Sequence, residues 1–543
     1  MQKLKSSLNE SLNESLNQRL QAKYPHLELA VLPLSQVNKD NESKRIDSEY
    51  FKKEYLEKIN LLSVISVKLG NLMTSGYYGV LPKSDDYLEN GISLVRGKDI
   101  REFSLEKSRL VKVPHCYFQE RYQIHKNDIL FLVKGATIGY EDGVLFIFEE
   151  PNEKMIFNGS VFKLQVKNIN PAYLYIFMMT KYFTAQKLRE VANNGIEYNS
   201  LPTIKNFLIP QFSQNFQLEI EKLVKDSHKA LEDSKALYKE AENLLYESLG
   251  LDSTNPLESL LKSTHPLAPS AREGEKEGYH TDSIHCHTER SEVSHHKDRD
   301  SSVASLPQND KDMNDLWLGK KYPHLNISIR TLTQSYGKSG RLDSEYYQSK
   351  YDAIERTIKD YKGGYCKLES SEIKDTNFTP KTQEKYRYIE IANISNNGNI
   401  SEPLEDLGAN LPTRARRKVK TGDLIMSSID GSLASCAIIT PEFDGCLVST
   451  GFYVLNSTKL NSETLLVLFK SAFFQDYLKK FPSGTILTAI SKDELLNVLI
   501  PKIDSTTQEQ IAFKIQKSFA LRKVAKDLLE SAKSKVECAI DNK

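Results

Sequence analysis

The chain has 543 residues, of which 39% are hydrophobic and 27% are charged, enough to bury the cores of several domains. Its 73 Lys and Arg residues nearly balance its 72 Asp and Glu residues, so any nucleic-acid site must be a local patch. Scattered cysteines without a C-x-x-C pair fit a reducing cytosol better than a disulfide scaffold. The polar N-terminus and the lack of a long apolar run predict neither a secretory signal nor a membrane span. We therefore expect a soluble, cytoplasmic protein that does not contact membranes.

The first 22 residues carry a leucine at every fourth position. A period of four drifts around an α-helix, and the intervening Asn and Ser residues weaken helix formation. Residues 1–22 are therefore predicted to form a marginal helix or an arm that needs a partner.

An internal repeat then organises most of the chain. The sequence KYPHL occurs twice, RIDSEYF returns as RLDSEYY, a K-N-D-I-L run matches K-T-G-D-L-I, and L-I-P occurs near the end of each copy. These pairs lie at Lys23–Leu27 and Lys321–Leu325, Arg45–Phe51 and Arg341–Tyr347, Lys126–Leu130 and Lys420–Ile425, and Leu208–Pro210 and Leu499–Pro501. The chain is therefore a tandem of two units, each with an entry segment, a globular module and a long helix.

Both globular modules have an α+β pattern. Short β-rich runs bounded by Gly, Asn and Lys predict strands, and longer apolar stretches predict one helix per module at 172–191 and 462–481. The predicted strands are 129–133, 144–148 and 161–166 in the first module, and 388–394, 423–427, 437–440 and 452–455 in the second.

Two long stretches have the heptad spacing of paired helices. The first runs from 217 to Gly250, which is a natural stop, and is roughly 50 Å long at about 1.5 Å per residue. The second runs from 508 to about 540, and each stripe is too narrow to be stable without a partner helix. The predicted seam comprises Ile220, Val224, Leu231, Tyr238, Leu245, Ile511, Ile515, Leu521 and Leu528. The alternative is that each helix packs only on its own module.

The segment between the two units is polar and cannot bury a core, so 251–316 is predicted to be a disordered insert. Its His285-Cys286-His287 and His295-His296 lack a zinc-binding spacing, so no metal site is expected. The predicted organisation is an arm at 1–22, a first module with its entry at 23–212, a helix at 213–250, the insert at 251–316, a second module with its entry at 317–504 and a helix at 505–543.

Enzyme motifs are missing from the sequence. Gly337-Lys338-Ser339 has no glycine five residues earlier, so it is interpreted as a turn and not a phosphate-binding loop. Neither a metalloprotease, a hydrolase elbow nor an adenine methyltransferase signature occurs. These absences favour a binding protein.

Candidate DNA contacts lie in polar or glycine-bearing turns of the modules. Arg and Lys can bind phosphates or guanine edges, and Asn can read adenine. The candidates are Tyr77, Tyr78, Arg96, Lys98, Lys134, Thr137, Tyr198 and Asn199 in the first module, and Lys381, Lys385, Arg387, Arg414, Arg416, Arg417, Lys418 and Ser428 in the second. A roughly 50 Å helical spacer could set two such modules on successive major grooves.

With its duplicated D-S-E-Y entries, its D-I-L and D-L-I strands, its L-I-P exits and the long helix after each, the chain resembles the specificity (S) subunit of type I restriction–modification systems. The resemblance implies an α+β fold in which two α/β target-recognition domains are separated by an antiparallel pair of long coiled-coil helices. It also implies a non-catalytic subunit that reads a bipartite, asymmetric site in double-stranded DNA and directs adenine methylation or restriction. The long insert departs from the family pattern.

The resemblance further implies the partners: two methyltransferase (M) subunits along the helices, and motor-nuclease (R) subunits. These partners would supply S-adenosylmethionine, ATP and magnesium, and this chain would bind no cofactor directly. Two alternatives remain at this stage: a stand-alone DNA-modifying enzyme with unrecognised motifs, and a coiled-coil scaffold for protein assembly.

Overall fold

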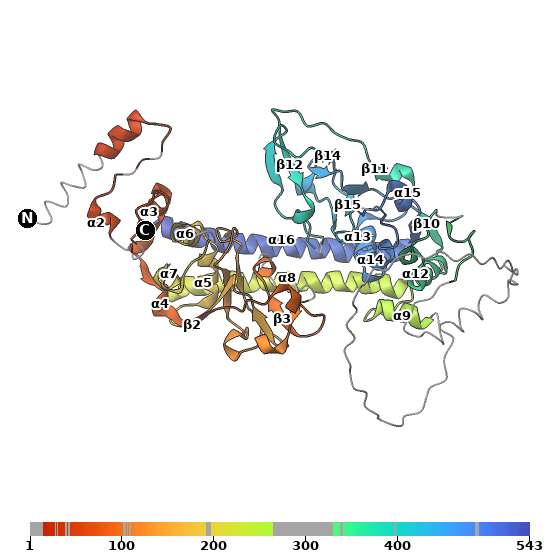
Figure 1. The fold of residues 1–543 in the computed structure, drawn as a ribbon, viewed down its shortest axis with the longest axis horizontal. Coiled ribbons are helices and arrows are strands. Elements are labelled where there is room, and N and C mark those ends of the chain that lie inside the picture. Colours follow the sequence, from red (N-terminus) through yellow and green to blue (C-terminus); the bar gives the residue numbers. More distant parts are fainter. Residues whose placement is uncertain are drawn as a thin grey trace, which may run out of the picture. The chain divides into compact units, whose positions relative to one another are not determined.

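The computed structural model describes residues 15–27, 29, 31–38, 41, 44–100, 105, 107, 110–191, 197–263, 329–336, 340–395, 398–483 and 488–543. They belong to two compact units, one of Met1–Ser234 with Phe519–Lys543 and the other of Lys235–Ser518. The boundary passes through both long helices, α8 (Gln214–Ser248) and α16 (Ser505–Asp541), so each unit owns part of each helix (Figure 1).

The first unit contains two sheets and a short two-stranded ladder. The four-stranded sheet has the order β2-β8-β5-β6 with antiparallel neighbours, and the three-stranded sheet has the order β4-β3-β7 with β3 and β7 parallel. The strands are β1 (Ser66–Lys68), β2 (Met73–Tyr78), β3 (Ile92–Val95), β4 (Val111–Val113), β5 (Ile129–Leu132), β6 (Val144–Phe146), β7 (Met155–Phe157), β8 (Val161–Val166) and β9 (Leu208–Pro210). The helices besides α8 and α16 include α2 (Leu34–Val37), α3 (Lys53–Ser63), α4 (Leu69–Leu72), α5 (Pro171–Met178), α6 (Lys181–Arg189) and α7 (Leu201–Asn206).

The largest core of the first unit joins its four-stranded sheet to both long helices. Phe131 of β5 and the apolar face of α5 pack in one cluster with Ile220 and Val224 of α8 and with Val536 of α16. All of these side chains are buried. The α8 and α16 segments of this unit are therefore part of its hydrophobic core.

The second unit repeats this architecture. Its sheets have the orders β11-β18-β15-β16 and β13-β12-β17-β14, and β10 pairs with β19 as β1 pairs with β9. The strands are β10 (Tyr365–Lys367), β11 (Ile373–Lys374), β12 (Lys385–Ile389), β13 (Leu404–Leu407), β14 (Ala415–Lys418), β15 (Leu424–Ser427), β16 (Cys436–Ile438), β17 (Leu447–Ser449), β18 (Phe452–Leu455) and β19 (Leu499–Pro501). The helices include α9 (Pro256–Ser263), α12 (Ser349–Lys359), α13 (Ser462–Lys470), α14 (Ala472–Leu478) and α15 (Lys492–Leu495). The predicted α+β class is confirmed for both units.

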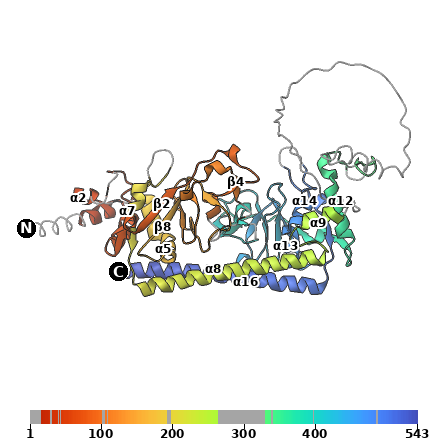
Figure 2. The same ribbon diagram turned by 90° about the horizontal axis from the view of Figure 1, so that it is seen from below.

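Within each unit the local parts of α8 and α16 lie side by side and antiparallel (Figure 2). In the first unit Ser227 donates a 2.7 Å hydrogen bond to the carbonyl of Ala525, and Glu219 pairs with Lys535. In the second unit Lys514 pairs with Glu240 at 2.5 Å. The helix pair predicted from the heptad spacing is therefore confirmed, and Gly250 follows α8 in the left-handed conformation (φ +71°) that suits a helix end.

Most of the predicted seam is buried, with one shift along α16. Ile220, Val224, Leu245, Ile511 and Ile515 are buried, whereas Leu231, Tyr238 and Leu521 are half-buried. Leu528 is also only half-buried, because its neighbour Leu529 enters the core of the first unit in its place. Helix α16 packs on the module as well as on α8 there, and its buried stripe is therefore shifted by one residue.

The duplicated entry motif is an internal clamp. Arg45 donates to the carbonyls of Arg189 and Val191, at the end of α6, and pairs with Asp47 at 2.7 Å. In the second unit Arg341 pairs with Asp343 at 2.7 Å and donates to the carbonyls of Lys480 and Phe481, just after α14. Guanidinium groups satisfy the free carbonyls at a helix end. The repeated R-x-D-S-E-Y sequence is thus explained by the same capping contact in both units.

The structure corrects the predicted helices of the modules and part of the predicted disordered insert. The single helices predicted at 172–191 and 462–481 are each two helices, since Thr180 donates to the carbonyl of Phe177 and Ser471 caps the N-terminus of α14. The prediction of a disordered insert is wrong for Pro256–Ser263, which forms α9 with Leu260 buried. The rest of the insert with its His and Cys residues, the first leucines of the arm, the second KYPHL and Gly337–Ser339 lie outside the described residues.

Candidate nucleic-acid interface

Five segments of the first unit meet at one end of its sheets, and we call them the first edge: residues 78–81, 95–98, 133–135, 158–160 and 197–199. Asn158 donates to the carbonyl of Val95, Val133 to that of Ser160 and Asn199 to that of Val133, each through its backbone N–H. Residues Lys134 and Tyr198 pair in an isolated β-bridge. Six of the eight sequence candidates of this module, namely Tyr78, Arg96, Lys98, Lys134, Tyr198 and Asn199, therefore lie on one continuous surface.

A glycine makes this convergence possible. A Cβ atom on Gly79 would lie 2.1 Å from the carbonyl oxygen of Phe157, so only glycine fits where the chain leaves β2. Neither Gly79 nor Leu81, which is 72% exposed, is among the residues predicted from the sequence. The glycines near the strand ends were the sequence signal that could have identified this surface.

The structure gives the edge candidates different roles. Tyr78 donates through its hydroxyl to the carbonyl of Asn199 at 2.8 Å, and Asn199 is fully buried with its amide donating to Lys187. Burial raises the pKa of Tyr78 to about 12. The Tyr78 hydroxyl and the Asn199 amide therefore hold the segments of the edge together.

The basic and aromatic groups of the edge remain suited to a ligand. Arg96 is held by Asp99 through two hydrogen bonds of 2.9 and 3.2 Å, which fix the plane of its guanidinium. Lys98 and Tyr198 are exposed, and Lys134 is half-buried. A fixed Arg, two Lys and an exposed aromatic ring match the groups that bind phosphates and base edges.

The other two candidates of the first module, Tyr77 and Thr137, lie just outside the segments of the first edge. Tyr77 packs on a core cluster beneath the sheet, with the Lys163 ammonium 6.0 Å from its ring. Thr137 is half-buried in a turn in which its carbonyl accepts the N–H of Tyr140.

The second-module candidates are not brought together in the same way. Lys385 and Lys381 are exposed and paired with Glu405 and Glu384. Arg387 lies over Phe443 and donates to the Glu442 carbonyl.

The basic run Arg414–Lys418 is split by β14. The Arg416 guanidinium donates back to the carbonyl of Thr413, while Lys418 lies over the ring of Phe378. Arg417 donates to the carbonyl of Phe452, and burial lowers its pKa. Arg414 directly precedes β14, and its carbonyl accepts the N–H of Thr450. Ser428 directly follows β15, and its hydroxyl donates to the Gly451 carbonyl.

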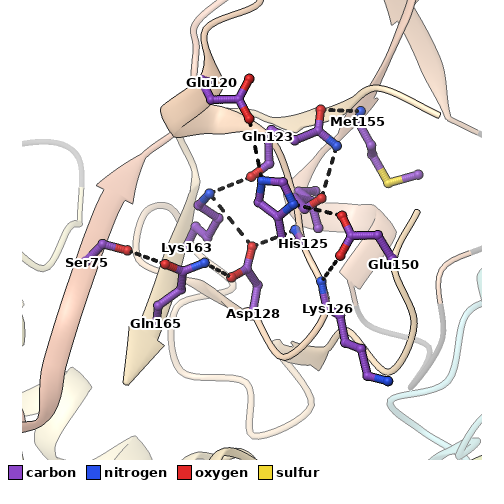
Figure 3. Close-up of polar contacts among 11 residues, drawn as sticks. Ser75, Glu120, Gln123, His125, Lys126, Asp128, Glu150, Met155, Lys163 and Gln165 are labelled. Atoms are coloured by element: carbon purple, nitrogen blue, oxygen red, sulfur yellow. Dashed lines mark hydrogen bonds and ion pairs between the residues drawn. The ribbon is translucent and has the colours of Figure 1, made fainter. Parts of the chain in front are cut away.

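The central strand of each unit starts at a buried aspartate. In the first unit Asp128 accepts hydrogen bonds from Gln165 at 2.6 Å and from the His125 backbone, and Lys163 lies 3.7 Å away (Figure 3). Asp128 is fully buried and Lys163 nearly so. Burial raises the pKa of Asp128 and lowers that of Lys163, because each charge has lost water.

The second unit builds the same cluster from a different strand. Asp423 is fully buried, accepts from Asn456 at 3.3 Å and pairs with Lys374 at 2.5 Å. Strand register places Lys374 at the position of Tyr77, directly opposite the position of Lys163. The two units therefore deliver a lysine to the same carboxylate from opposite strands.

His125 closes the outer side of the first cluster. Its ring is 2.8 Å from Glu150, and its backbone N–H binds Asp128, as Figure 3 shows. Among the described residues, no group of three or more His, Cys, Asp and Glu side chains is arranged to hold a metal ion. Within the same residues, no helix combines the length and the apolar character that crossing a bilayer requires.

Comparison with known proteins gives structural matches only. No family model matches the chain, and neither does any curated protein. The type I restriction–modification S subunit from M. genitalium has 12% identity and a TM-score of 0.30, covering 88% of this chain and 94% of that one. The HsdS subunit from Thermoanaerobacter tengcongensis and a structure on complex assembly and conformational transition of the type I system each have 12% identity and a TM-score of 0.25, covering 88% of this chain and 96% of theirs. All three are proteins of type I restriction–modification systems, the family that the sequence resembles.

Proposed function

We propose that the chain is the non-catalytic DNA-specificity subunit of a type I restriction–modification complex. Each unit would read one half of a bipartite, asymmetric site in duplex DNA, and partner subunits would carry out adenine methylation or cleavage. The observation that carries this proposal is a scaffold repeated contact by contact, with different side chains presented at the strand ends.

The repeated contacts are specific. The Arg45 and Arg341 clamps match, as do the buried Asp128 and Asp423, and in each unit a tyrosine hydroxyl bonds to the strand-end segment. A duplicated frame with unlike contact residues is expected of a protein that reads two different half-sites with one docking mode. The arginine and lysines of the first edge supply phosphate and base-edge donors there.

Exchanging residues 52–205 for the corresponding module of another S subunit is expected to change one half of the methylated site and leave the other half unchanged. The replaced segment contains the whole first edge, whereas the second unit keeps its own strands. Long-read mapping of methyladenine in hosts that carry each version measures the result. A change in both half-sites, or methylation without any bipartite motif in the wild type, would contradict the proposed function.

We also propose that the duplicated entry segments bind two M subunits. Leu34 and Leu332 follow the two KYPHL motifs at equal spacing, and Ile46 and Leu342 follow the clamp arginines; these four side chains are between 72% and 87% exposed. Large aliphatic side chains repeated at matching exposed positions suit two copies of one apolar partner surface. R subunits would then join through the M subunits, and S-adenosylmethionine, ATP and magnesium would be bound by the partners.

Replacing Leu34 and Ile46 together by aspartate is expected to remove one M subunit. Each buried aliphatic side chain contributes roughly 1.5–3 kcal/mol, so the pair should weaken one site by more than about a hundredfold. Native mass spectrometry of the complex should show one M subunit in place of two, and the same for Leu332 with Leu342. Leu404→Asp, at another exposed aliphatic residue, is the control; unchanged stoichiometry in both double variants would sink the docking proposal.

A further inference from the structure

The second unit has a surface that matches the first edge, and we call it the second edge: residues 375, 389–392, 428–430, 449–451 and 488–490. The N–H of Ser428 donates to Gly451, that of Ile490 to Ser428 and that of Asp430 to Thr488. These bonds correspond to those of Val133 with Ser160, Asn199 with Val133 and Gly135 with Glu197. The two edges are thus built from the same strand ends by the same backbone contacts.

The turns that follow β3 and β12, the strands with a parallel neighbour, correspond residue by residue in the two units. In the first unit Val95 of β3 is opposite Phe157, and the Arg96 N–H donates to Asp99 at 2.9 Å. In the second unit Ile389 of β12 is opposite Val448, and the Glu390 N–H donates to Asn393 at 2.7 Å. Arg96 therefore corresponds to Glu390, and Lys98 to Ala392.

The two edges differ in charge at these positions. The first edge presents Arg96, Lys98 and Lys134 where the second presents Glu390, Ala392 and Ile429. Next to the bridge, Gly135 corresponds to the exposed Asp430. The carboxylates of Glu390 and Asp430 accept hydrogen bonds, and an ionised carboxylate offers about four lone-pair sites, so capping the local turns leaves acceptor capacity.

We propose that the second unit reads bases through the second edge, with the carboxylates of Glu390 and Asp430 accepting from exocyclic amino groups such as cytosine N4 or adenine N6. This proposal rests on the proposed function. Carboxylates are the side chains that accept from base amino groups, while arginine suits the O6 and N7 acceptors of guanine. The basic residues of β12 and β14, which were predicted as contacts from the sequence, would then contact at most the phosphate backbone. Their charged groups already bind different side chains and carbonyls within the second unit.

Two cations lie directly beside the second edge and can hold the phosphates next to such bases. Lys492 pairs with Asp375 at 2.6 Å at the start of α15, and Arg414 is exposed next to Thr450. Pairing with Lys492 reduces the repulsion between the Asp375 carboxylate and the DNA phosphates, since the two charges offset each other. A mixed surface of this kind gives base discrimination without strong non-specific attraction.

The test compares conservative variants on the two surfaces in the full complex with its M subunits. Glu390→Gln and Asp430→Asn keep the size of each side chain but remove its charge, and Lys385→Ala and Lys418→Ala change the exposed cations of β12 and β14. Binding is selected from a duplex library randomised in both half-sites, with hydrogen exchange of the second unit as the check on folding. The edge variants are expected to lose about ten- to a hundredfold preference at one position of the second half-site and to leave the first half-site unchanged.

The strand variants are expected to weaken binding to all sequences alike. An unchanged second half-site in both edge variants, or a changed base preference in either strand variant, would overturn the inference. A wild-type complex that selects no bipartite sequence would instead overturn the proposed function, so the two failures are distinguishable.

Discussion

Replacing Asp128 by alanine is expected to lower the free energy of unfolding of the first unit by about 3–5 kcal/mol. Lys163 is 3% exposed, and the substitution leaves its ammonium in the interior without the partner carboxylate. It also removes the acceptor of the Gln165 amide. Hydrogen exchange read by mass spectrometry measures the loss, and the second unit of the same chain serves as an internal reference.

Two compensating variants make this prediction specific to the buried charge. Asp128→Ala with Lys163→Met should recover most of the stability, because no charge then remains buried. With Asp128 intact, Tyr77→Lys with Lys163→Val should preserve the cluster, because the second unit supplies Lys374 from that strand position. Equal loss of stability in Asp128→Ala and in Asp128→Ala with Lys163→Met would show that the unpaired lysine charge does not determine the cost.

Replacing Lys187 by methionine is expected to stabilise the first unit by about 3 kcal/mol at pH 7. Lys187 is fully buried on α6, with its ammonium 3.4 Å from the carbonyl oxygen of Tyr140. Burial lowers the pKa of Lys187 from 10.5 to about 8, against the smaller raising effects of Asp142 and Glu141. The folded state therefore disfavours the charge that the unfolded chain carries at neutral pH.

The sign of the pH dependence follows from this shift. Between pH 8 and 10.5 the unfolded state binds more protons than the folded state, so the wild type gains stability as the pH rises. Below about pH 8 both states are protonated and the cost is constant. The stability difference between Lys187→Met and wild type should thus be largest at neutral pH and shrink above pH 8, as measured by urea unfolding at pH 7 and 9.5. A difference that does not depend on pH would refute the assignment, and Lys222→Met, at an exposed position of α8, is the control.

The sequence alone determined the long-range plan of this protein. Heptad spacing identified α8 and α16 and most of their buried face, and repeated motifs identified the two units, because periodic burial and a duplicated frame leave a pattern in the order of residues. Candidate contacts of the first module were found because they lie in polar or glycine-bearing turns.

Only the tertiary structure decided which of those residues are available to a ligand. Tyr78 and Asn199 have the residue types of DNA contacts but serve as internal ties, and Arg417 donates to a backbone carbonyl. The second edge could not be seen in the sequence, since its carboxylates and small residues become a surface only when five distant segments meet. Residue type states what a side chain can bind, whereas burial and hydrogen-bond partners state what it already binds, and these depend on contacts between residues far apart in the chain.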